Sequence, residues 1–264
     1  MRGFGATRRA AVALLVLAVL GPFVPLVLWA VAGDFRYPRV LPPLSGRGLA
    51  RVLDADVLAA LGTSAAIASA VAVLAALVGL AAGRALGRYR FRGRRLVQLL
   101  LLAPALVPTI AVTLGIQVFF VRYGLSDSAL GVVLVHLVPT VPYVSLVMAG
   151  IFAELDPGLE DQARVLGAGP LRRLLLVVLP AVRPGLVVAA LLAFLVSWSE
   201  YILTLLIGGG TVRTLPLLLF AAIGGSDLTA AAALGLVIAL PPLVLVLATA
   251  RTLTGPAALG LGRV

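Results

Sequence analysis

Ionisable side chains are rare inside the long apolar stretches of this chain, and two of them, His136 and Glu200, are the first candidates for chemistry. His136 is the single histidine, and the chain has no cysteine, which excludes disulfides and a cysteine nucleophile and disfavours a transition-metal site. A lone histidine in an apolar helix is a functional candidate by default, but it can also bond to a neighbouring carbonyl group. We favour the structural role for His136.

Glu200 lies in the sequence Ser-Trp-Ser-Glu-Tyr near the end of an apolar run. Hydrocarbon cannot satisfy a carboxylate, so we expect Glu200 to face a partner chain or a polar path. Ser197 and Thr204 lie one turn before and one turn after it, which predicts a polar stripe along one helix side. Trp198 and Tyr201 fit either interfacial aromatics or the lining of that path. We favour path lining for Glu200, with a structural partner as the alternative, and the other four residues are candidates for the same path.

The elements that carry these residues are long apolar runs. The 264 residues are 62% hydrophobic with a mean hydropathy of +1.16, whereas a soluble domain has about half apolar residues. Uninterrupted runs of about 20 apolar residues span a membrane as helices, since lipid leaves no backbone group unpaired. We predict an all-α polytopic membrane protein with six transmembrane helices, at 10–32, 57–83, 96–121, 129–152, 182–207 and 229–250.

The first of these runs also has features of a cleavable signal. It follows three arginines, and Ala30-Val31-Ala32 resembles a cleavage site. Its apolar stretch is about twice the length of a signal core, so we favour an uncleaved span.

Arginine sets the orientation, because every basic residue of the chain is an arginine. The net charge of +11 would suggest nucleic acid in a soluble protein, but here it lies in short segments between apolar runs, so no nucleic-acid partner is expected. With the N-terminus inside, fifteen arginines fall in inner segments and six in outer ones. The positive-inside rule therefore favours both termini in the cytoplasm. We interpret the cluster 84–95 as an orientation anchor that contacts anionic lipid.

Two further segments carry weaker signals. The prolines of the outer segment 33–56 predict an irregular surface loop. Gly79 and Gly83, four residues apart in the second run, permit close approach of another helix, although such a pair is common by chance in a chain with 28 glycines.

The inner segment 153–181 is too structured for a simple connector. Asp156 and Pro157 have the order of an N-cap and a first helical residue, and Gly167 suits a left-handed helix end. Glu160 and Arg164 are spaced as an i,i+4 ion pair.

A second short helix is predicted after that glycine. Pro170 opens it, Pro180 stops it, and Pro184 begins the fifth span. The pattern fits equally a helical lever that projects from the membrane and an amphipathic hairpin that lies on lipid headgroups.

A resemblance separates these alternatives. The order Asp161-Gln162-Ala163, three residues, Gly167-Ala168, and later Leu179-Pro180 resembles the EAA loop of the permeases of binding-protein-dependent ABC importers. Aspartate replaces the usual glutamate and Gln162 the first alanine. The resemblance implies that the first short helix couples to an ATPase, with the coupling residues Asp161, Gln162, Ala163, Leu166, Gly167, Ala168 and Pro180.

Other motifs extend the resemblance over about residues 57–250. They are the Ser-Trp-Ser-Glu-Tyr segment, Thr214-Leu215-Pro216, and the prolines Pro104 and Pro108. The resemblance implies a type I ABC importer permease fold, closest to the polyamine, iron and thiamine branch. We divide the chain into 1–56 (tail, first helix, outer loop), 57–250 (five-helix core with the loop 153–181) and 251–264 (cytoplasmic tail).

Partners follow from the resemblance and from one missing residue type. A phosphate-binding loop needs a lysine, and the chain has none, so ATP and Mg²⁺ are expected on a partner ATPase, with no cofactor and no catalytic residue here. The resemblance implies an ATPase dimer, a second permease subunit, identical or different, and an extracytoplasmic substrate-binding protein.

Two other functions compete with this one. A secondary transporter usually shows internal repeats and ionisable residues at mid-membrane, and we find no repeat and only Glu200. A non-transporting assembly or signalling subunit is disfavoured by the helix–glycine–helix loop. ATP dependence of transport would separate these alternatives.

The arginine distribution makes a testable prediction about topology. A single Arg92→Cys substitution places the only thiol of the chain in the predicted inner cluster. We expect no labelling by an impermeant thiol reagent added outside intact cells, and labelling after the membrane is opened. Labelling from outside would reverse the orientation.

Overall fold

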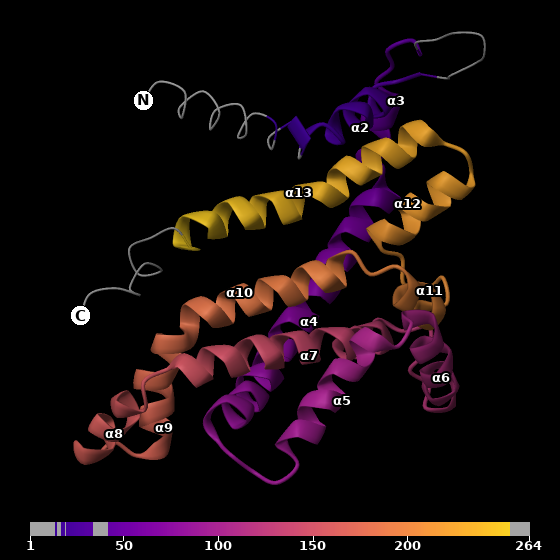
Figure 1. Ribbon diagram of the computed structural model, residues 1–264. Helices are drawn as coiled ribbons and strands as arrows, with labels where there is room; N and C mark the ends of the chain where they lie inside the picture. Colours follow the sequence, from indigo (N-terminus) through magenta and orange to yellow (C-terminus); the bar gives the residue numbers. More distant parts are fainter. Residues whose placement is uncertain (1–13, 15–16, 19, 34–41, 254–264) are drawn as a thin grey trace, which may run out of the picture. The chain divides into compact units, whose positions relative to one another are not determined.

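The computed structural model describes residues 14, 17–18, 20–33 and 42–253, and these are almost entirely helical (Figure 1). One isolated antiparallel bridge joins Ala32 and Leu44. The prediction of an all-α chain is confirmed. The helices, in chain order, are α2 (Phe23–Ala30), α3 (Arg47–Val52), α4 (Ala55–Arg88), α5 (Arg94–Leu106), α6 (Thr109–Arg122), α7 (Ala129–Glu154), α8 (Pro157–Val165), α9 (Pro170–Arg173), the π-helix η1 (Leu174–Val178), α10 (Leu179–Trp198), α11 (Ile202–Gly208), α12 (Leu215–Gly224) and α13 (Leu228–Leu253).

The helices form two compact units. The first contains the described residues up to Leu61 together with Leu215–Pro242, and the second contains Gly62–Thr214 and the described residues from Leu243 onward. The division by membrane topology into 1–56, 57–250 and 251–264 stays a prediction.

Four helical stretches are long and apolar enough to cross a membrane within the described part of the chain. They are Ala55–Arg88, Ala129–Glu154, Pro170–Trp198 and Leu228–Leu245. A fifth span results if the bent pair of α5 and α6 is counted as one. The chain is thus polytopic. The count of six stays a prediction, because much of the run 10–32 lies outside the described residues.

The third predicted span, 96–121, is broken rather than continuous. Arg94–Pro104 and Thr109–Arg122 meet at an angle of 97°. Val107 has extended backbone at φ −94° and ψ 134° and is followed by Pro108. The proline ring disfavours helical geometry in the residue before it, which accounts for the break at this point.

The fifth predicted span, 182–207, is wrong at both ends. Pro180 does not stop a helix, because α9, η1 and α10 form one helical stretch from Pro170 to Trp198. The π turn Leu174–Val178 directly precedes the helix that holds Pro180 and Pro184, so the chain passes both prolines with a local widening of the helix. At the other end, the helix stops at Trp198 and resumes as α11.

The first unit is held by polar contacts around α3, where an irregular loop was expected. Arg47 Nη2 lies 3.1 Å from Asp227 Oδ1, and the same carboxylate accepts a bond from the Ala230 N–H at the start of α13. Arg51 donates to Asp56 and to Asp54, and these two hydrogen bonds raise the pKa of Arg51 above its ordinary value.

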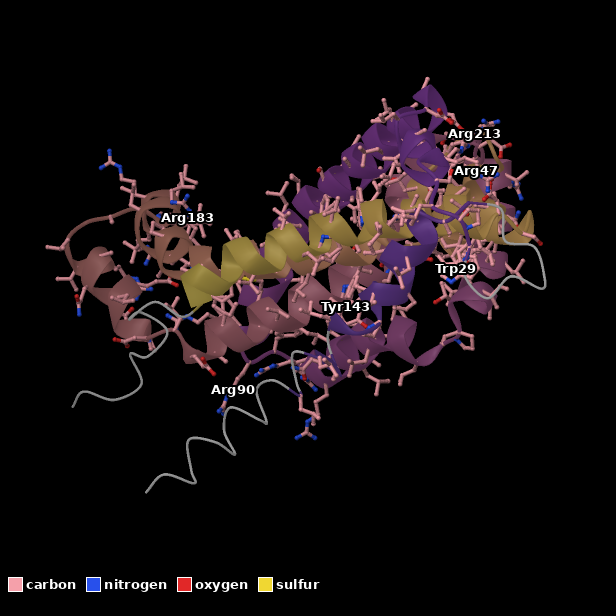
Figure 2. All side chains as sticks on the ribbon, turned by 90° about the horizontal axis from the view of Figure 1, so that it is seen from above. Trp29, Arg47, Arg90, Tyr143, Arg183 and Arg213 are labelled. Atoms are coloured by element: carbon pink, nitrogen blue, oxygen red, sulfur yellow. The ribbon has the colours of Figure 1, made fainter. Side chains whose placement is uncertain are left out.

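The second unit is built around α7, which packs along α10 (Figure 1). Their shared core contains Val144, Met148 and Phe152 from α7 with Val182 and Ala189 from α10, all nearly inaccessible. Two arginines of this unit, Arg90 and Arg183, are exposed and project outward from the ribbon (Figure 2).

The glycine pair of the second span is a helix contact, and it extends by one further residue. A side chain at Gly79 would meet Val144, one at Gly83 would meet Met148 Cβ, and one at Gly87 would approach the Ala149 carbonyl oxygen at 2.5 Å. Three glycines at four-residue spacing therefore let α4 approach α7 closely, the mode by which small residues drive helix association in lipid.

This packing predicts different effects for two glycine-to-alanine substitutions in α4. Gly83→Ala adds a methyl group against Met148, whereas Gly62 has open space around it. We expect Gly83→Ala to lower the free energy of unfolding in detergent by about 1–3 kcal/mol through overpacking. Gly62→Ala should leave it unchanged or raise it slightly, because alanine favours helix. Equal stability of the two variants would contradict the close contact.

Candidate functional site

The segment between α7 and α10 folds into the predicted helix, glycine break and second helix. The carboxylate of Asp156 accepts a hydrogen bond from the Gly158 N–H at 2.8 Å, and Pro157 opens α8. The cap satisfies a backbone donor at the helix start, where the proline has none to offer.

The end of α8 is a Schellman motif centred on Gly167. The Gly167 N–H donates to the Arg164 carbonyl at 3.0 Å, and the Ala168 N–H donates to the Ala163 carbonyl at 2.9 Å. Gly167 has φ +81°, and nothing lies within 4 Å of the position its Cβ would occupy. Backbone conformation alone therefore demands glycine here.

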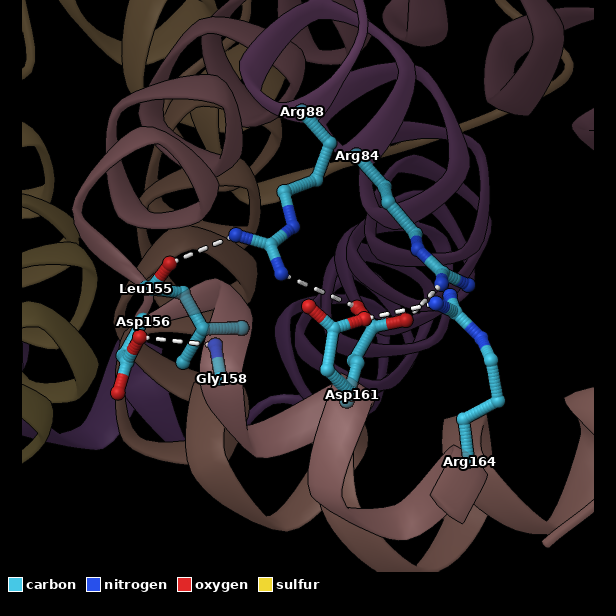
Figure 3. A network of polar contacts seen from close by, with 8 residues as sticks. Arg84, Arg88, Leu155, Asp156, Gly158, Asp161 and Arg164 are labelled. Carbon is cyan, nitrogen blue, oxygen red and sulfur yellow. Dashed lines mark hydrogen bonds and ion pairs between the residues drawn. The ribbon is translucent and has the colours of Figure 1, made fainter. Parts of the chain in front are cut away.

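Glu160 fastens α8 to the end of α4. Its Oε2 lies 2.8 Å from Arg84 Nη2, and its Oε1 lies 3.7 Å from Arg88 Nη2. Arg88 Nη1 also donates to the Leu155 carbonyl, at the end of α7, at 2.8 Å (Figure 3). Only 10% of the Glu160 side chain is exposed. Three helices, α4, α7 and α8, are thus joined through one carboxylate and two arginines.

This arrangement corrects the predicted Glu160–Arg164 pair. Arg164 instead bonds to Asp161 at 2.7 Å, and both side chains are about 60% exposed (Figure 3). The reason is the direction of each side chain. Glu160 points inward to the two arginines of α4, whereas Asp161 and Arg164 are both exposed on the outer face of α8. The sequence interpretation treated the arginine cluster 84–95 as a lipid anchor. Two of its members, Arg84 and Arg88, form ion pairs with the Glu160 carboxylate.

The tip of α8 is apolar and exposed. Val165 and Leu166 are each 87% exposed, the highest value of any large hydrophobic side chain that the structure describes. Gln162, beside them, is exposed as well, and Ala163 is half-buried. Pro180 is exposed within α10 and does not belong to this tip.

The Ser-Trp-Ser-Glu-Tyr segment contains a helix break. Residues Ser199 to Tyr201 lie between α10 and α11, and Glu200 is in the break rather than inside a helix. Its Oε1 accepts a hydrogen bond from the Leu203 N–H at 3.2 Å, so the carboxylate caps α11. Trp198 is 2% exposed and stacks on Phe194 at 5.7 Å between ring centroids, so it faces the interior of the chain rather than an interface with water.

The predicted polar stripe of Ser197, Glu200 and Thr204 is therefore divided. Ser197 Oγ lies 2.8 Å from His136 Nδ1, and Thr204 Oγ1 lies 2.9 Å from His136 Nε2. All three side chains are buried. Glu200 does not take part through its carboxylate. The preferred structural role of His136 fits these contacts, which join α7 to both sides of the break.

A cavity of about 500 Å³ lies beside this region, at the bend between α5 and α6. Its walls include Pro104, Val107 and Pro108 from the bend and Pro139, Pro142 and Tyr143 from α7. From α10 it reaches Val196, the neighbour of Ser197. The five predicted path residues are not among the residues that line it.

Two sets of contacts in this site were not predicted from the sequence. Arg84 and Arg88 are four residues apart on one face of α4, a spacing that favours a shared partner, but which loop residue they meet depends on the tertiary fold. The partners of His136 lie 61 and 68 residues away along the chain. Their only signal in the sequence was that both are hydroxyl residues on the predicted polar side of an apolar run.

Comparison with curated proteins finds permease subunits. The chain is 30% identical over 140 residues to the "Putrescine transport system permease protein PotI" of Escherichia coli (strain K12), covering 51% of this chain and 50% of that one. It is 33% identical over 116 residues to the "Maltodextrin transport system permease protein MdxG" of Bacillus subtilis (strain 168), covering 44% and 42%. The chain spans about half the length of the curated relatives it matches.

Two comparisons cover more of the chain. The fold matches the structure titled "Crystal structure of a bacterial ABC transporter involved in the import of the acidic polysaccharide alginate" with a TM-score of 0.68 at 17% identity, over 96% of this chain and 97% of that one. At that identity the match shows the fold alone. The profile of the family described as "Binding-protein-dependent transport system inner membrane component" matches residues 75–254, well over half of the chain. By this match, the chain belongs to the family of inner membrane components of binding-protein-dependent transport systems.

Proposed function

We propose that this chain is a permease subunit of an ATP-driven importer, which forms half of a translocation path and couples to a separate ATPase through α8. The observation that carries the proposal is the combination of the family match with an α8 that has a fixed base and a free apolar tip. A lever needs both features, because a mobile base would not transmit movement and a covered tip would not receive it.

The base of the lever is the Glu160 carboxylate between Arg84 and Arg88. The 2.8 Å contact with Arg84 is a charge-assisted bond, which is about twice as strong as a neutral one. Because Arg88 also holds the end of α7, a displacement of α8 would act on α4 and α7 together. Both helices are long and apolar enough to cross a membrane.

The tip of the lever supplies the docking surface. Val165 and Leu166 stand out beside the exposed Asp161–Arg164 pair, so an apolar contact is flanked by charge. A hydrophobic centre with a polar rim is typical of protein interfaces. The ATPase dimer, with its ATP and Mg²⁺, is the proposed partner, since a chain without lysine offers no phosphate-binding loop of its own.

The remaining partners and the orientation are also proposed. A second permease subunit, identical or different, would complete the path, and both termini and α8 would face the cytoplasm, as the arginine distribution favours. One structure with a matching fold is titled as an alginate ABC transporter "in complex with alginate pentasaccharide-bound periplasmic protein", which supports an extracytoplasmic binding protein here. The named cargoes of the relatives, putrescine, maltodextrin and alginate, differ in charge and size, so substrate choice is assigned to that partner.

The first test of coupling uses two glycines of the loop. Gly167 has φ +81°, whereas Gly169 has φ −66° and precedes a proline, and both have open space. Gly167→Val should strain the backbone by about 1–3 kcal/mol and reorient the tip. We expect the assembled complex to hydrolyse ATP with strongly reduced transport, while Gly169→Val behaves as the parent. Transport at the parental rate by Gly167→Val would contradict the lever.

The second test separates the base of α8 from its outer face. Glu160→Gln removes the charge between the two arginines, and Asp161→Asn removes the charge of an exposed pair. We expect amide hydrogen exchange in residues 157–165 to accelerate on the order of tenfold in Glu160→Gln, because the nearly buried bond loses its charge and two arginines lose their counter-ion. In Asp161→Asn it should change little, since exposed pairs contribute little. Equal exchange in both variants would show that Glu160 does not hold α8.

A further inference from the structure

Three buried side chains from two separated segments form a continuous polar network. His136 Nδ1 lies 2.8 Å from Ser197 Oγ, and Nε2 lies 2.9 Å from Thr204 Oγ1. The exposed fractions are 1% for His136, 4% for Ser197 and 0% for Thr204. Both ring nitrogens of the only histidine in the chain are therefore satisfied by hydroxyl groups, away from water.

The two hydroxyls belong to different helices. Ser197 is in the last turn of α10 and Thr204 in the first turn of α11, seven residues apart. In one straight helix, seven residues extend roughly 10 Å along the axis. The path from Ser197 Oγ across the ring to Thr204 Oγ1 consists of two hydrogen bonds of 2.8 and 2.9 Å and the width of one imidazole ring, and its total length is shorter than that distance. A single ring therefore reaches both hydroxyls because the helix is broken between them.

The network also has a direction. Thr204 Oγ1 lies 3.3 Å from the Glu200 carbonyl oxygen, which can only accept, so the hydroxyl proton of Thr204 is donated to it. The same oxygen must then accept from His136, which places the ring proton on Nε2. The other ring nitrogen is an acceptor in that tautomer, and Ser197 donates to it. The chain of bonds runs from Ser197 through His136 and Thr204 to Glu200.

We propose that His136 is the positioning residue of the acidic helix break: as the neutral Nε2–H tautomer it joins α10 to α11 and fixes the backbone of Glu200. The Glu200 carboxylate accepts from the Leu203 N–H at 3.2 Å, so both ends of the residue are held. This inference deepens the proposed transport function and rests on it for the path role that the sequence pattern predicts for Glu200, whereas the network itself rests only on contacts within this chain.

Lipid makes such an anchor necessary. An unwound segment next to apolar helices is tolerated where protein groups satisfy its backbone. Thr204 satisfies the Glu200 carbonyl, and its own hydroxyl is oriented by His136. Thr140, one turn along α7 and also buried, provides a matched control, because its hydroxyl donates to the His136 carbonyl within its own helix.

The tautomer can be measured directly, because one histidine gives one pair of ring signals. The full chain, labelled with ¹⁵N-histidine and purified through a tag without histidine, is reconstituted in lipid for solid-state NMR. We expect a protonated Nε2 and an unprotonated Nδ1. An Nδ1–H tautomer or an imidazolium in the parent chain would overturn the proposal, whatever the variants do.

Two variants should then respond differently. Thr204→Val removes the acceptor for Nε2–H, so the population should shift toward Nδ1–H, with Ser197 accepting. Ser197→Ala removes a donor only and should keep Nε2–H, as should Thr140→Val. An unchanged spectrum in Thr204→Val, or a shift in Ser197→Ala alone, would also overturn the direction of the network.

The positioning role has its own measurement. A Ser199→Cys reporter places the only thiol of the chain in the break, where the residue is exposed. Adding His136→Ala should raise its rate of reaction with N-ethylmaleimide about fivefold to tenfold, since two interhelical hydrogen bonds are lost. Adding Thr140→Val should not. Equal rates in all three chains would refute positioning, whereas the expected rates in a complex without transport would count against the proposed function alone.

Discussion

Lipid offers no hydrogen-bond partners, and this single constraint explains most of what the chain does with its polar groups. Where the helix stops between α10 and α11, side chains of the chain replace some of the missing bonds. Glu200 caps α11, Thr204 bonds to the Glu200 carbonyl, and His136 connects the two sides of the break. The single histidine is fully used by this task.

The same constraint governs the end of α4, where the chain meets more polar surroundings. Glu160 is nearly buried, and a carboxylate there is tolerated because Arg84 and Arg88 converge on it. A pair on the outer face, such as Asp161 with Arg164, is solvated on both sides and contributes little. Two adjacent acidic residues therefore have different consequences. Glu160 fixes the position of α8 against α4, whereas Asp161 lies on the exposed surface of α8.

Close packing in lipid cannot rely on the hydrophobic effect, since lipid tails are as apolar as leucine side chains. The second unit uses glycine instead. Gly79, Gly83 and Gly87 bring α4 against α7. Arg84 and Arg88 directly follow the last two of these glycines and contact Glu160 of α8. The helix contact and the ion pair therefore depend on each other, because the glycines that bring α4 close to α7 also determine where Arg84 and Arg88 lie relative to Glu160.

Residue patterns by themselves determined what is local in this protein. The apolar runs, the Asp156 cap and the glycine at the end of α8 were all predictable, because helix capping and positive φ depend on neighbours within a few residues. The family resemblance was carried by the same local motifs, and the profile match confirms it. Periodicity also identified Gly79 and Gly83 as a permissive pair, although it could not name the helix that would approach them.

Tertiary structure alone decided which polar groups meet. An i,i+4 spacing suggested Glu160 with Arg164, but the electrostatic field of two arginines on another helix outweighs a solvated neighbour. The stripe of Ser197, Glu200 and Thr204 assumed an unbroken helix, but the helix is broken at Glu200 and a histidine about sixty residues away contacts both sides of the break. Partners that distant are set by packing, and one sequence contains no local signal for them.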